Sequence, residues 1–130
     1  MRGPTLLKVA IVDDEPDLQR LYQLALSSRG YDIAFVANDG TDAVEKNRRS
    51  PARVIIMDHR MPTKNGVEAT REILSECPQT SVIFVSADEA VEKEAKEAGA
   101  VRFLKKPISL KDLIKNIEDV AKSLNNKNNK

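Results

Sequence analysis

The 130-residue chain is predicted to be one α/β domain built on a parallel β-sheet with helices on both faces. Two observations predict this fold. Short runs rich in β-branched residues alternate with segments of helical length, and four of the five runs are almost wholly apolar, as in parallel strands buried on both faces. The runs are VAIV (9–12), IAFV (33–36), VIIM (54–57), VIFV (82–85) and VRFL (101–104). Because crossovers between parallel strands are right-handed, few topologies remain.

In the segments that follow these runs, apolar residues recur at helical spacing. Prolines and glycines mark the helix ends: Pro16 and Gly30 for the first, Gly40 for the start of the second, Gly66 and Pro78 for the third, Gly99 for the end of the fourth. The apolar positions are Leu18, Leu21, Tyr22 and Ala25; Ala43 and Val44; Val67, Thr70, Ile73 and Leu74; Val91, Ala95 and Ala98; and Leu110, Leu113, Ile114, Ile117, Ala121 and Leu124. The last stripe is the strongest of the five.

Composition is consistent with one domain and narrows its partners. The chain has no run of about 18 apolar residues, and its N-terminus lacks the apolar region of a signal peptide. Cys77 is the single cysteine, which excludes an intramolecular disulfide, so we expect a reduced, cytoplasmic location. A net charge of +1 predicts neither a nucleic acid nor a membrane as partner. We expect the domain to span residues 8–124, with flexible termini at 1–7 and 125–130.

Acidic residues follow two of the predicted strands. Asp13 and Asp14 come after the first strand, and Asp58 comes after the third. The carboxyl ends of parallel strands share one edge of the sheet, where ligands bind, so we expect these carboxylates to lie together. Like charges in contact repel by about 4 kcal/mol at the effective dielectric near a protein surface. Either the acids point into water or a cation lies among them, and oxygen ligands without histidine or cysteine favour Mg²⁺.

A hydroxyl and two ammonium groups follow the remaining strands of that edge. Ser86 follows the fourth strand, while Lys105 and Lys106 follow the fifth. A lysine and a hydroxyl are suited to holding the oxygens of a phosphoryl group, whose charge a metal and a lysine would neutralise. The carboxylate of Asp58 could then accept the phosphoryl group as an aspartyl-phosphate.

Four segments, taken in order on this alternating frame, resemble the response-regulator receiver domain of two-component signalling, as in CheY. They are VDDE (12–15), MDHRMPTKNG (57–66), VSA (85–87) and GAVRFLKKPI (99–108). The resemblance covers residues 8–124. It implies a flavodoxin-like, doubly wound fold with five parallel strands in the order 2-1-3-4-5.

The resemblance also implies roles for single residues. Asp58 would be the phosphoacceptor, and Mg²⁺ would be held by Asp13, Asp14, Asp58 and the backbone carbonyl of Arg60. Lys106 would pair with the phosphoryl group, and the bond to the following Pro107 is often cis in the family. Ser86 and Phe103 would be switch residues, and Arg60 and Asp88 would tune the lifetime of the phosphoryl group. Three alternatives remain. Lys105 competes with Lys106, Phe103 could instead be plain packed core, and His59 is expected to be a solvated loop residue rather than a phosphorelay or metal residue. Two positions depart from the family pattern: Asn47, where a hydrophobic residue is common, and Arg53, where an acidic one is.

The function implied is that of a regulatory phosphoacceptor rather than a turnover enzyme. A sensor histidine kinase or phosphotransfer protein would supply the phosphoryl group. A downstream protein would bind the face formed by the fourth helix, fifth strand and last helix, which we expect to change most on phosphorylation. One rival is a metal-dependent phosphatase with an aspartate nucleophile, although Arg60 stands where the second acid of its D-x-D motif belongs. The other is an unphosphorylated interaction scaffold.

Overall fold

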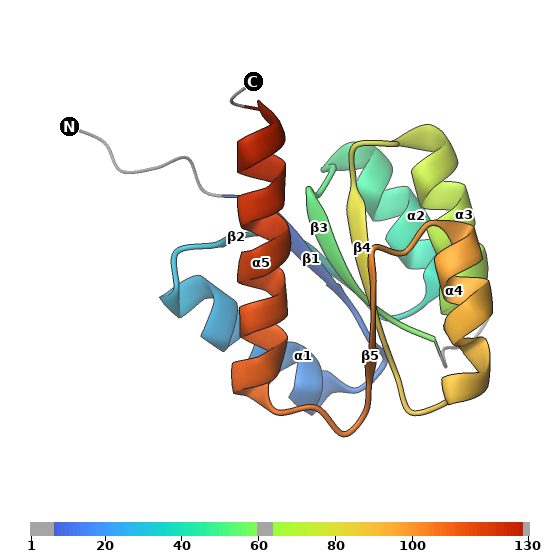
Figure 1. Cartoon of the computed structure of the whole chain (residues 1–130), viewed down its shortest axis with the longest axis horizontal. Helices are drawn as coiled ribbons and strands as arrows, with labels where there is room; N and C mark the ends of the chain where they lie inside the picture. Colours follow the sequence, from blue (N-terminus) through green and yellow to red (C-terminus); the bar gives the residue numbers. More distant parts are fainter. Residues whose placement is uncertain (1–6, 60–63, 129–130) are drawn as a thin grey trace.

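The sheet has five strands, all parallel, and is seen between two groups of helices in Figure 1. The computed structural model describes residues 7–59 and 64–128, with side chains described as far as Leu124. The strands are β1 (Lys8–Val12), β2 (Asp32–Ala37), β3 (Val54–Asp58), β4 (Ser81–Ser86) and β5 (Arg102–Lys105). Their order in the sheet is β2-β1-β3-β4-β5, which confirms the expected topology.

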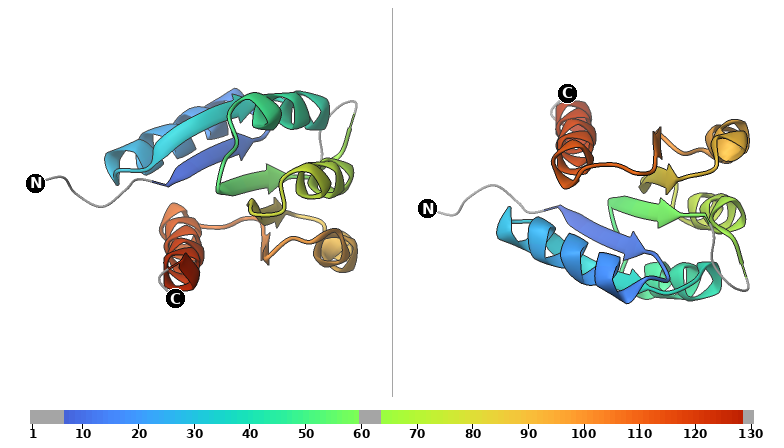
Figure 2. Two further views of the ribbon diagram at one scale, coloured as in Figure 1. Left: turned by 90° about the horizontal axis from the view of Figure 1, so that it is seen from above. Right: turned by 90° about the horizontal axis from the view of Figure 1, so that it is seen from below.

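The helices divide between the two faces of the sheet (Figure 2). They are α1 (Pro16–Ser28), α2 (Gly40–Arg49), α3 (Gly66–Glu76), the short 3₁₀ helix η1 (Glu89–Val91), α4 (Glu92–Ala98) and α5 (Leu110–Asn128). Helices α1 and α5 cover one face, and α2, α3 and α4 cover the other. The last helix continues beyond Leu124. None of the helices in the described residues is long and apolar enough to cross a membrane.

Alternate residues of the central strands enter two separate cores. In β1, Ala10 and Val12 pack with α2, α3 and α4, whereas Val9 and Ile11 pack with α1 and α5. The same alternation holds in β3, whose five residues are all buried. This burial on both faces explains why the strands are continuous apolar runs in the sequence. Because all the strands are parallel, their carboxyl ends meet at one edge of the sheet.

Two details of helix packing differ from the sequence prediction. Leu21 was placed on the apolar stripe of α1, but it is 45% exposed, and Leu26 lies in the core instead. The other predicted stripe positions, Leu18, Tyr22 and Ala25, do pack on this core, so the prediction was wrong only for Leu21. Asn47 is buried in α2, where its side-chain oxygen accepts a hydrogen bond of 2.9 Å from the backbone N–H of Ala52. That bond satisfies a buried donor, which explains a polar residue at an apolar position.

Candidate metal centre

The three predicted carboxylates meet at the carboxyl edge of the sheet. Asp13 follows β1, and Asp58 is the last residue of β3. One carboxylate oxygen from each of Asp13, Asp14 and Asp58 lies within 4.8 Å of the other two. Asp13 and Asp58 are buried, whereas Asp14 is exposed. The donor set consists of oxygen alone, which fits a hard cation such as Mg²⁺, open to water on the Asp14 side.

Lys106 brings a positive charge to this cluster. Its Nζ lies 3.3 Å from Oδ1 of Asp58 and 3.7 Å from Oδ2 of Asp13. Lys105 points elsewhere and forms an ion pair of 2.8 Å with Glu89 on the surface. The peptide bond between Lys106 and Pro107 is cis. Of the two competing lysines, the geometry therefore brings Lys106 to the carboxylates.

The electrostatics show a site with too much negative charge for one lysine. Burial raises the pKa of Asp58, an effect that Lys106 opposes. Burial also raises the pKa of Asp13, against the backbone N–H of Glu15, and the charge of Asp58 adds to the increase. Burial alone lowers the pKa of Lys106, but Asp58 and Asp13 outweigh it, and the net shift is upward. The anionic forms of Asp13 and Asp58 are therefore disfavoured in the metal-free site, and a bound cation would stabilise them.

Backbone contacts fix the position of Asp13 and its loop. The Asp13 N–H donates to the carbonyl of Ala37 at 3.1 Å, and Oδ1 of Asp13 accepts from the N–H of Glu15 at 2.9 Å. The side-chain amide of Gln19 donates to the carbonyl of Asp13. The loop after β1 is thus tied both to β2 and to the first turns of α1.

Gly66, at the start of α3, packs directly against the backbone of the Asp58 region. Its N–H donates to the carbonyl of His59 at 3.1 Å. A Cβ at this position would lie 2.4 Å from the carbonyl oxygen of Asp58 and 2.9 Å from the ring of Phe84. Only glycine allows this approach, so α3 directly supports the end of β3.

Ser86 and Phe103 lie on the neighbouring strands β4 and β5. Ser86 is buried at the end of β4, and its Oγ accepts a hydrogen bond of 3.1 Å from the N–H of Asp88. Phe103 is half-buried in β5, with its ring stacked on Phe84 at a centroid distance of 6.0 Å. Phe103 therefore packs against the core from the edge of the sheet, an arrangement compatible with either interpretation of this residue. Arg60 lies outside the described residues, so the structure does not address its two predicted roles.

His59 differs from the expected solvated loop residue. It is half-buried, and its ring packs on Phe84 at a centroid distance of 5.8 Å. Its Nδ1 is buried and has no hydrogen-bond partner in the described part of the chain. The prediction was wrong because nothing in the sequence indicated that the ring of His59 would pack on Phe84.

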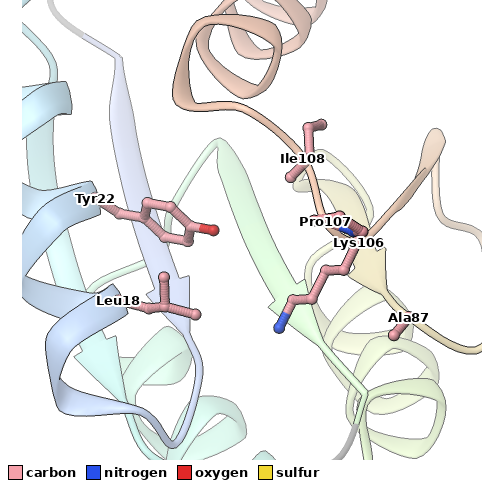
Figure 3. Close-up of a pocket in the computed structure, with 6 residues that line it drawn as sticks. All are labelled: Leu18, Tyr22, Ala87, Lys106, Pro107 and Ile108. Atoms are coloured by element: carbon pink, nitrogen blue, oxygen red, sulfur yellow. The ribbon is translucent and has the colours of Figure 1, made fainter.

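A mostly apolar pocket of about 410 Å³ opens beside Lys106 (Figure 3). Leu18 and Tyr22 of α1 line one side, and Ala87, Lys106, Pro107 and Ile108 line the other. The hydroxyl of Tyr22 and the ammonium of Lys106 both point into the space between α1 and the strand ends (Figure 3). Helical spacing predicts only a core position for Tyr22, because it does not show that the tip of the ring reaches the edge of the sheet.

Comparison with known proteins gives the same assignment along nearly the whole domain. The family model described as the response regulator receiver domain matches residues 9–118. The chain is 32% identical over 117 residues to the chemotaxis protein CheY of Thermotoga maritima, covering 88% of this chain and 98% of CheY. It is 35% identical over 127 residues to the transcriptional regulatory protein PdtaR of Mycobacterium tuberculosis, covering 91% of this chain but only 62% of PdtaR.

A solved complex that contains BeF₃ and Mg²⁺ also includes a chain of similar structure. The CheX–CheY–BeF₃–Mg²⁺ complex from Borrelia burgdorferi contains a chain that is 28% identical, with a TM-score of 0.76 and coverage of 88% of each chain. The fold, the placement of the acidic cluster and the family match all agree. The chain belongs to the family of response-regulator receiver domains of two-component signalling.

Proposed function

We propose that the domain accepts a phosphoryl group on Asp58 and thereby switches a protein-binding surface. The observation that carries the proposal is the convergence of Asp13, Asp14, Asp58 and Lys106 at one edge of the sheet. Membership of the receiver family supports a regulatory phosphoacceptor rather than a phosphatase of the haloacid-dehalogenase type.

In the proposed reaction a carboxylate oxygen of Asp58 attacks the phosphorus atom of a phosphohistidine on a kinase or phosphotransfer protein. A phosphorus–oxygen bond forms as the phosphorus–nitrogen bond breaks, and the imidazole leaves with the electron pair and takes up a proton. Lys106, already 3.3 Å from Asp58, is placed to pair with the phosphoryl oxygens. A Mg²⁺ ion held by Asp13, Asp14 and Asp58 would neutralise charge on the transferring group.

The proposed switch uses Ser86 and Phe103. The hydroxyl of Ser86 would turn from the Asp88 N–H towards the phosphoryl group, and the half-buried ring of Phe103 would move further inward. Both residues lie on strands next to the η1–α4 segment, in which only Val91 and Ala95 are buried. An element with so small an apolar contact opens at low free-energy cost, so the α4–β5–α5 face is the proposed binding surface for a downstream protein.

Intact mass after incubation with acetyl phosphate and Mg²⁺ tests the proposal. The parent is expected to gain one phosphoryl group, and Asp58→Asn or added chelator should abolish the gain. Asp17→Asn is the matched control, because Asp17 is an exposed aspartate in the first turn of α1 with only a surface ion pair to Arg20. If the parent gains no mass under any condition, the domain acts as an unphosphorylated scaffold and the proposal fails.

We further propose that Arg60 and Asp88 set the lifetime of the phosphoryl group. In the described residues the carboxylate of Asp88 accepts a hydrogen bond from the N–H of Ala90 at 3.0 Å. A contact between Arg60 and Asp88 would shield the aspartyl-phosphate from water. Arg60→Ala should then speed dephosphorylation modestly, as an exposed ion pair contributes about 0–1 kcal/mol. An unchanged rate of phosphate release would remove this role.

A further inference from the structure

A second cavity lies at the opposite end of the sheet from the carboxylates. Its volume is about 450 Å³, within the usual range for small-molecule sites. It lies where β3 and β4 begin, beside the loop after α3, the turn after α4 and the C-terminal part of α5 (Figure 1). Arg53 precedes β3 and Asp58 ends it, so the cavity is roughly 16 Å from the acceptor at about 3.3 Å per strand residue.

The backbone of Arg53 is hydrogen-bonded on both sides, whereas its side chain at the cavity wall is not held in this way. Its N–H donates to the carbonyl of Lys8 at 2.8 Å, and its carbonyl accepts from the N–H of Ser81 at 2.7 Å. The side-chain Nε is buried and has no hydrogen-bond partner among the described side chains. Within residues 7–59 and 64–124, the guanidinium has no ion pair. A half-buried cation is therefore left with an unused donor at a cavity wall.

The rest of the lining combines apolar side chains with two hydroxyl groups and the amide of Gln79. Leu74, Val101 and Leu124 provide the apolar surface, and Val101 is 49% exposed. Thr80 already donates to the carbonyl of Ala52 at 2.7 Å. None of the residues described as lining the cavity is acidic. The wall thus offers one positive group without a competing carboxylate, next to apolar side chains.

This juxtaposition points to a ligand with two parts. A carboxylate matches the planar donor arrangement of a guanidinium and can accept two parallel hydrogen bonds from it. An alkyl or aryl body would cover Leu74, Val101 and Leu124. We propose that this cavity binds a small amphiphilic carboxylate, with Arg53 pairing with the carboxylate. The site does not involve Asp58, so it is independent of the proposed phosphoryl transfer.

Amide chemical shifts of the full chain, labelled with ¹⁵N and titrated with hexanoate, test this inference. Hexanoate should shift the amides of Ser81 and Val101 saturably, and hexan-1-ol and inorganic phosphate should each bind at least about tenfold more weakly because they lack one half of the ligand. Arg53→Gln should weaken hexanoate binding by a similar factor. Arg71→Gln, which changes an exposed arginine on α3 outside the cavity, should leave it unchanged.

Two further variants keep the result interpretable. Val101→Glu places a negative charge beside the cavity at an exposed position, and should weaken binding even if Arg53→Gln proves unstable. Asp58→Asn should bind hexanoate normally, which separates this site from the phosphoacceptor. The inference is overturned if hexanoate causes no saturable shifts, if hexan-1-ol binds equally well, or if phosphate alone binds as tightly as hexanoate.

Discussion

Replacing Lys106 with methionine should destabilise the metal-free domain through charge rather than packing. At an effective dielectric of 20, the 3.3 Å contact with Asp58 corresponds to about 5 kcal/mol of attraction and the 3.7 Å contact with Asp13 to about 4.5 kcal/mol. Desolvation of the ammonium offsets much of this. Removing one partner of a buried pair costs about 3–5 kcal/mol. Because the Lys106 side chain is 22% exposed, we expect the lower end, a loss of about 3 kcal/mol.

The assay is urea unfolding at pH 7.5 with chelator, for Lys106→Met beside Lys105→Met. Lys105 makes only an exposed pair with Glu89, so its replacement should cost about 0–1 kcal/mol. Asp58→Asn combined with Lys106→Met should recover part of the loss, because one unpaired carboxylate is removed. Added Mg²⁺ should do the same. The reasoning is refuted if the two lysine variants unfold at the same urea concentration.

The free energy of unfolding that is lost in Lys106→Met should depend on pH in a definite direction. The pKa of Lys106 is raised above 10.5 in the fold, so its contribution is complete below that pH and is lost only at more alkaline pH. The pKa values of Asp13 and Asp58 are raised above 3.8. As pH falls through those raised values the carboxyl groups take up protons and no longer need a counter-charge. The deficit of Lys106→Met should therefore shrink at acid pH, which urea unfolding across the acid range would measure.

Three further predictions concern the packing of Gly66, the buried hydrogen bond of Asn47 and the pH dependence of Mg²⁺ binding. Gly66→Ala should cost about 1–3 kcal/mol in urea unfolding and slow phosphoryl uptake, because the new Cβ would meet the carbonyl of Asp58; an unaltered unfolding midpoint would contradict it. Asn47→Leu should cost about 1–3 kcal/mol despite its apolar surroundings, because the N–H of Ala52 loses its acceptor; a neutral result in thermal unfolding would show that water replaces the amide. As pH is lowered, Mg²⁺ affinity measured by calorimetry should begin to fall at a higher pH than for ordinary aspartates, because the pKa values of Asp13 and Asp58 are raised and protons compete with the metal for their carboxylates; a loss of affinity only at the pH expected for ordinary aspartates would count against it.

The strands were predictable from the sequence because burial on both faces leaves a continuous apolar run, and VIIM and VIFV became β3 and β4 nearly to the residue. The convergence of Asp13, Asp14 and Asp58 followed from topology alone, since parallel strands end at one edge. The choice between Lys105 and Lys106 did not follow from the residues, because both could reach that edge. Only the structure shows which ammonium lies beside the carboxylates.

Other features depended on contacts that spacing does not reveal. The helical pattern could not show that Leu21 faces outward while Leu26 is buried, as both lie near the edge of the same stripe. His59 was misplaced because its ring is held by Phe84, a residue distant in the chain. Asn47 and Arg53 were both noted as departures, yet the structure gives them different explanations. The first completes a backbone hydrogen bond, and the second leaves a donor unused.

The two consecutive lysines of the β5 end connect the interior of the domain to its surface. Lys106 contacts buried carboxylates, while the residue before it, Lys105, holds Glu89 in η1. A single peptide unit separates these ion pairs, so the backbone cannot shift at one without changing the geometry of the other. If Lys106 moved inward in the proposed switch, the exposed Lys105–Glu89 ion pair at η1, just before α4, would lie one covalent step away and its geometry would change.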